Sequence, residues 1–136
     1  MPNHLDASAL IKIALRAESL AAGPCNCTRT PLDGWNSQPV SLDEHQLEEI
    51  GTLVVDDDPE PSYREHLPGK LDYWSPEAPI TPHFFPYNRC TVWQCTQCSR
   101  VYLRYTEGGG YFVDRRIRAV HSALIQDVPL GALVSA

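Results

Sequence analysis

Long apolar runs are absent from the 136-residue chain, and their absence excludes a class of protein. No run approaches the roughly 18 consecutive apolar residues that a membrane-spanning helix needs. A secretory signal is also absent, because Asp6 stands where a basic segment belongs and Lys12 and Arg16 interrupt the apolar residues around them. The sequence therefore predicts a cytoplasmic protein that does not enter a membrane.

Catalytic motifs are missing as well. The five histidines are scattered, with neither the H-E-x-x-H pair of zinc proteases nor the H-x-E of zinc deaminases. The glycine-rich stretch 107–110 lacks the Lys-Ser/Thr that follows a phosphate-binding loop, and a hairpin turn explains it. These absences favour a non-enzymatic protein.

Basic residues are scarce in one part of the chain and acidic residues are scarce in another, although the formal net charge is −6. Nine acids and one base lie within 43–65, whereas six arginines, two acids and no lysine lie within 89–118. An acidic surface suits a basic protein partner. Arginines beside aromatic residues suit nucleic acid, but they suit structural ion pairs equally well. The acidic net charge disfavours nucleic acid as the partner.

Helical signals occur in two places along what we expect to be a single domain spanning 1–136. Apolar residues recur at helical spacing over 5–22, and Gly23-Pro24 provides a stop. A second helix is expected over 41–51, because Ser41 and Glu44 form a capping box.

The remainder of the chain predicts a sheet and an irregular segment. Seven of the twelve prolines lie within 56–86 together with several aromatic residues, so we expect an ordered wrap on the core, or alternatively an extended binding surface. Alternating residues over 89–119 predict a three-stranded meander. The expected fold class is α+β, with two helices packed on a small antiparallel β-meander.

Four of the five cysteines form two close pairs. Cys95 and Cys98 lie three residues apart on the expected turn between two strands, which is the geometry of a zinc knuckle. Cys25 and Cys27 form the other pair, just after the first expected helix. Zinc prefers four tetrahedral ligands, and thiolates are soft ligands that suit it. The sequence therefore predicts a structural Zn²⁺ site with these ligands: Cys25, Cys27, Cys95 and Cys98.

Other interpretations of the cysteines stay open at this point. A rival ligand set consists of His83, Cys90, Cys95 and Cys98. The cysteines can also be small buried apolar residues without a metal. Disulfides are disfavoured in a reducing compartment. Many knuckles carry glycine after the second cysteine for a positive φ angle, whereas Ser99 stands here.

In general character, the chain resembles the small immunity proteins that neutralise bacterial toxins. The resemblance rests on the missing catalytic set and on a group of acids: Asp43, Glu44, Glu48, Glu49, Asp56, Asp57 and Asp58. It implies a non-enzymatic protein that binds a basic toxin domain, with all of these acids except Glu49 expected at the interface. Glu44 and Glu48 would share one face of the second helix.

The segment around Cys95 and Cys98 is also similar to the knuckle of zinc-ribbon proteins. That resemblance implies the alternative function, a nucleic-acid-binding or regulatory module. Ser99 and the C-x-C spacing of Cys25 and Cys27 depart from the usual ribbon pattern.

Overall fold

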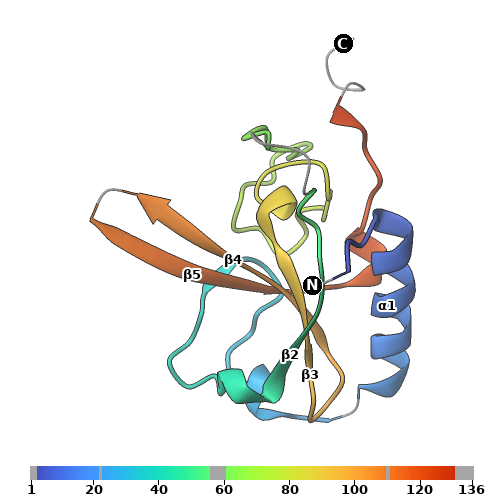
Figure 1. The fold of residues 1–136 in the computed structure, drawn as a ribbon, viewed down its shortest axis with the longest axis vertical. Coiled ribbons are helices and arrows are strands. Elements are labelled where there is room, and N and C mark those ends of the chain that lie inside the picture. Colours follow the sequence, from blue (N-terminus) through green and yellow to red (C-terminus); the bar gives the residue numbers. More distant parts are fainter. Residues whose placement is uncertain (1–2, 22, 56–60, 110, 131–136) are drawn as a thin grey trace.

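A computed structural model describes residues 3–21, 23–55, 61–109 and 111–130. Within these residues the chain forms one α-helix and a five-stranded antiparallel sheet (Figure 1). The fold class α+β is therefore confirmed. The strand order is β1-β5-β4-β3-β2. The elements are α1 (Ala7–Leu20), β1 (Asn36–Ser37), β2 (Leu47–Thr52), β3 (Thr91–Cys95), β4 (Val101–Gly109) and β5 (Phe112–Ala119), with 3-10 turns η1 (Asn26–Thr28), η2 (Glu44–Gln46), η3 (Tyr87–Arg89) and η4 (Ser122–Leu124).

The helix α1 forms where the sequence predicts the first helix. Asp6 caps its N-terminus by accepting a hydrogen bond from the backbone N–H of Ala9 at 2.8 Å. Leu10, Ala14 and Ala17 are buried, so one stripe of the helix faces the sheet. Figure 1 shows α1 beside the sheet, with the β4–β5 hairpin extending away from it. In the described part of the chain, no helix has the length and apolar character needed to cross a membrane.

The three strands expected in the meander are present as β3, β4 and β5, and side chains cover both faces of the sheet. Because side chains alternate along a strand, Val92 and Leu103 point to one face, where they pack in a core with Leu10 of α1. We call this the helix face. Tyr102 and Cys95 point to the opposite face and belong to a second, smaller core. We call this the cysteine face.

The prediction of a second helix over 41–51 is wrong. Glu44–Gln46 forms only the short turn η2, and the chain then continues as β2. The side chain of Asp43 caps η2 by accepting from the backbone N–H of His45 at 3.0 Å. Pairing with β3 satisfies backbone groups of both strands and buries Leu47 opposite Cys95. A capping box is a local signal, and here strand pairing outweighs it. Glu44 and Glu48 therefore share no helical face.

The proline-rich segment is described from residue 61 onward, whereas 56–60 lie outside the described residues. It packs on the core, because Ile80 and Phe84 are fully buried. Arg118 of β5, which is 0% exposed, binds this segment by donating to the carbonyls of Pro76 at 3.2 Å and Ala78 at 2.6 Å. This part of the chain is therefore an ordered wrap on the helix face. The single domain over 1–136 stays a prediction.

Candidate metal centre

The first pair of cysteines lies on η1, a turn held by local hydrogen bonds. The backbone N–H of Thr28 donates to the carbonyl of Cys25 at 3.0 Å, and the Thr28 hydroxyl accepts from the backbone N–H of Cys25 at 2.9 Å. The turn brings the thiol of Cys25 and the buried thiol of Cys27 to the cysteine face of the sheet.

The second pair lies on the turn between β3 and β4. Cys95 ends β3, and its carbonyl accepts from the backbone N–H of Ser99 at 2.9 Å. Ser99 has φ = 73°, in the left-handed region that favours glycine. A residue with a Cβ in this region costs roughly 1–2 kcal/mol. The turn therefore keeps the backbone shape of a knuckle although serine occupies the glycine position.

The four thiols meet in one cluster. Their sulfur atoms all lie within 4.8 Å of one another. Cys25 Sγ and Cys95 Sγ are 3.8 Å apart, and Cys27 Sγ and Cys98 Sγ are 3.4 Å apart. Zn–S bonds of about 2.3 Å in a tetrahedron give sulfur separations of about 3.8 Å, whereas a disulfide needs about 2.05 Å. All four cysteines are free, and the cluster can hold a metal ion.

Two polar side chains donate hydrogen bonds to the sulfurs. Gln46 Nε2 of η2 donates to Cys95 Sγ at 3.1 Å and to Cys25 Sγ at 3.4 Å, while Asn26 Nδ2 holds the Gln46 carbonyl oxygen at 3.1 Å. The Tyr102 hydroxyl of β4 donates to Cys27 Sγ at 3.1 Å. Such donors orient metal ligands and stabilise thiolates. Sequence reasoning missed both, because Gln46 lies within the expected second helix and Tyr102 is one of the aromatic residues beside the arginines of 89–118.

The thiols of the cluster differ in acidity. Burial raises the pKa of Cys25, but hydrogen bonds from the backbone and thiol of Cys27 and from the other thiols outweigh it and lower that pKa to about 7. Burial raises the pKa of Cys27 well above its usual value. The nearby thiol of Cys98 raises the pKa of Arg100. Several thiolates this close together repel one another, so a divalent cation would stabilise the cluster.

One side of the cluster faces solvent. Cys25 and Cys98 are half-buried, and they border a polar hollow of about 670 Å³ together with Gln46. The other residues around this hollow are Pro24, Asn26, Ser41, Asp43 and Gln97. Small chelators in solution can therefore reach two of the four sulfurs.

The rival ligand set is not brought together. Cys90 is fully buried in the core on the helix face, and its thiol donates to the carbonyl of Pro86 at 3.3 Å. His83 Nε2 lies 3.3 Å from a carboxylate oxygen of Asp127. Among the described residues, the only group of three or more potential ligands within coordination distance is the four-cysteine cluster.

The acids expected to contact a partner occupy different positions. Asp43 is exposed and caps η2, and Glu48 is exposed on β2. Glu44 instead turns toward the sheet. A hydrogen bond from Gln38 lowers its pKa, and the nearby Arg104 and Arg115 lower it further. Asp56, Asp57 and Asp58 lie outside the described residues.

The arginines of the meander are largely used within the protein. The Arg104 guanidinium lies over the Trp93 ring, 4.6 Å from its centroid. Arg116 pairs with Glu107 at 3.3 Å and with Asp114 at 3.0 Å. These contacts engage side chains that a nucleic-acid surface would need to present.

In comparisons with protein-family models, with curated proteins and with solved structures, nothing matches this chain.

Proposed function

We propose that the protein is a zinc-stabilised, non-enzymatic protein-binding module. The observation that supports it is the meeting of four thiols from two distant segments at the sulfur separations of a tetrahedral site. Four sulfur ligands favour zinc or an iron–sulfur cluster, and a single ion fits the separations of these four sulfurs. Four thiolates complete the coordination of zinc, so no position is left for a reacting water. The metal would therefore be structural.

Metal content is the first test. Protein purified under reducing conditions is expected to hold about one zinc per chain, as a four-thiolate site requires. Cys98→Ser is expected to lose it, because serine replaces a thiolate ligand with a neutral hydroxyl. Cys90→Ser is the matched control, since Cys90 is a buried cysteine outside the cluster. Elemental analysis of the three proteins gives the answer. Folded wild-type protein without metal, or equal zinc in Cys98→Ser, would contradict the proposal.

The proposed partner is a basic protein, such as a toxin domain that this chain would neutralise. β2 is an edge strand of the sheet and carries the exposed acids Glu48 and Glu49, one on each face, and exposed Asp43 precedes it in the chain. Complementary charge speeds association with a basic partner. Charged side chains on an edge strand also prevent unwanted strand pairing. The two roles differ in whether a specific basic partner depends on these acids.

Charge reversal separates the two roles. Glu48→Lys/Glu49→Lys is expected to abolish capture of a basic partner from a lysate of the source organism. The control is Glu65→Lys/Glu77→Lys, which changes the net charge equally at exposed acids of the proline-rich segment. The control is expected to recover the same partner as the wild type, as identified by mass spectrometry. Equal recovery by both double variants would leave the acids of β2 with only the role of preventing strand pairing.

A further inference from the structure

A second polar site lies on the cysteine face, beyond the metal cluster toward the β4–β5 hairpin. The strand register places Thr91 opposite Arg104, and Arg115 opposite Thr106. Two guanidinium groups and two hydroxyls thus come from three neighbouring strands. They surround a hollow of about 170 Å³ lined by Thr91, Trp93, Arg104, Tyr105, Thr106 and Arg115.

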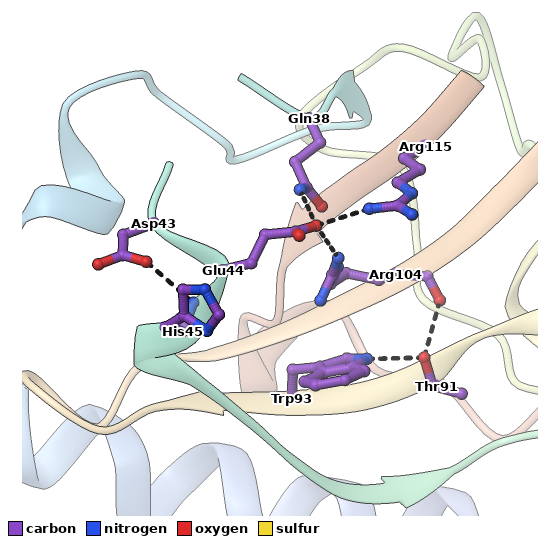
Figure 2. Close-up of polar contacts among 8 residues, drawn as sticks. All are labelled: Gln38, Asp43, Glu44, His45, Thr91, Trp93, Arg104 and Arg115. Atoms are coloured by element: carbon purple, nitrogen blue, oxygen red, sulfur yellow. Dashed lines mark hydrogen bonds and ion pairs between the residues drawn. The ribbon is translucent and has the colours of Figure 1, made fainter. Parts of the chain in front are cut away.

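The carboxylate of Glu44, on η2, contacts the two arginines that line this hollow. Figure 2 shows it pointing toward Gln38, Arg104 and Arg115. All three donate to the same oxygen, Glu44 Oε1: Gln38 Nε2 at 2.6 Å, Arg104 Nη2 at 2.8 Å and Arg115 Nη1 at 2.9 Å. Three donors, two of them charged, that converge on one oxygen form the arrangement of an anion-binding site. Glu44 itself supplies the anion.

The site carries more positive than negative charge in these ion pairs. Two guanidinium groups face one carboxylate. The side chain of Arg104 is only 14% exposed. Burial lowers its pKa, Glu44 raises it, the positive charge of Arg115 lowers it again, and the charge of Glu49 raises it. A dianion that displaced Glu44 would place two negative charges against the two guanidinium groups.

The contacts of Glu44 with Arg104 and Arg115 are weak enough for another anion to displace its side chain. Its side chain is 42% exposed, and it belongs to a turn of three residues. The ion pair with Arg115, whose side chain is 64% exposed, is of a kind that contributes little to stability. A free monocarboxylate would make the same contacts as Glu44 but without its high local concentration, so it cannot compete. A phosphate monoester has about two negative charges and three acceptor oxygens, so it can engage both arginines and the hydroxyl of Thr106 as well.

The size and the charge of the protein restrict the ligand further. The hollow is smaller than the roughly 300 Å³ at which pockets for drug-sized ligands begin, and its volume suits a single phosphate group. The net charge of −6 repels long polyanions. We propose that this hollow binds a phosphate monoester, presented by a small molecule or by a phosphorylated side chain, and that Glu44 competes with this ligand for the two guanidinium groups.

The test compares two variants that remove the same charge. Glu44→Gln vacates the site, whereas Glu48→Gln removes a carboxylate from β2. Full-length protein is titrated with inorganic phosphate at a pH above the second pKa of that ion, so that the probe is a dianion, and calorimetry and indole NMR shifts give the affinity. We expect Glu44→Gln to bind at least about tenfold more tightly than wild type, because the tethered competitor is gone. Glu48→Gln is expected to change the affinity by less than about twofold, because salt screens distant charges.

Two further measurements test which residues bind the phosphate and which kind of molecule carries it. Adding Arg115→Gln to Glu44→Gln is expected to abolish the gain, since one of the two cationic donors is lost. Tighter binding of phenyl phosphate than of a phosphoserine peptide assigns a small-molecule source, and the reverse assigns a phosphorylated protein. Equal phosphate affinity in Glu44→Gln and Glu48→Gln overturns the proposal. If Glu44→Gln does not fold, Arg115→Gln at a 64% exposed side chain replaces it, and unchanged wild-type affinity in that variant overturns the proposal equally.

Discussion

Removal of the metal is expected to release residues 25–46 from the sheet. Zinc binding contributes about 10–16 kcal/mol to small zinc domains near neutral pH, while whole domains are stable by only about 5–15 kcal/mol. The core on the cysteine face is the smaller of the two, with Leu32, Leu42 and Leu47 packed on Tyr102 and Ile117. Without the cation, the four thiols beside this core would no longer join residues 25–46 to the turn between β3 and β4.

Hydrogen exchange measures this release. A chelator under reducing conditions has access to the half-buried Cys25 and Cys98, and exchange of the amides in 25–46 is expected to rise strongly. Amides of α1 are expected to be less affected, because α1 packs in the larger core on the helix face. Added zinc should restore protection, and Cys90→Ser should respond as the wild type does. If metal-free protein kept the same exchange pattern and melting temperature, the metal would not be structural.

Replacing Arg118 by methionine is expected to lower the free energy of unfolding by about 3–5 kcal/mol, since each buried polar group left unpaired costs about 1–3 kcal/mol. Arg118 is 0% exposed and donates to the carbonyls of Pro76 and Ala78 and to the hydroxyl of Tyr87. Methionine fills the space of the aliphatic stem but leaves all three acceptors unpaired. Removing a buried charge also recovers its desolvation cost, which opposes this loss.

A matched arginine shows which effect dominates. Arg115→Met removes the same charge from the same strand at a 64% exposed side chain, and it is expected to cost less than about 1 kcal/mol, as surface ion pairs do. Arg118→Lys is expected to fall between the two, because lysine keeps the charge but not the planar fork. Urea unfolding compares the three variants. A loss below about 1 kcal/mol for Arg118→Met would mean that desolvation of the guanidinium cancels the value of its hydrogen bonds.

Local signals in the sequence were sufficient for the parts of the fold that depend on near neighbours. The spacing of Leu10, Ala14 and Ala17 predicted α1, because residues three or four positions apart lie on one face of a helix. Alternation over 89–119 predicted β3, β4 and β5 for the corresponding reason in strands. The two cysteine pairs were visible because each pair lies on its own short turn.

Tertiary contacts decided what local signals could not. Ser41 and Glu44 favour a helix start in isolation. The residues that follow instead pair with the edge of β3 and form β2. Cys90 is closer in sequence to Cys95 than Cys25 is, yet it points to the other face and into another core. Sequence distance did not indicate which cysteines share a face, because the chain folds back on both sides of the sheet.

The sequence by itself determined the helix α1, the meander and the residue types that can hold a metal. The sequence also predicted the cluster of Cys25, Cys27, Cys95 and Cys98, but only the tertiary structure decided between it and the rival set. Only the tertiary structure showed that Gln46 and Tyr102 donate to the sulfurs and that Glu44 turns inward to Arg104 and Arg115. The physical reason is the distance along the chain between the residues that interact. Helix and strand periodicity arises between neighbours, whereas thiol clustering and the burial of Arg118 require segments that meet only after the sheet has formed.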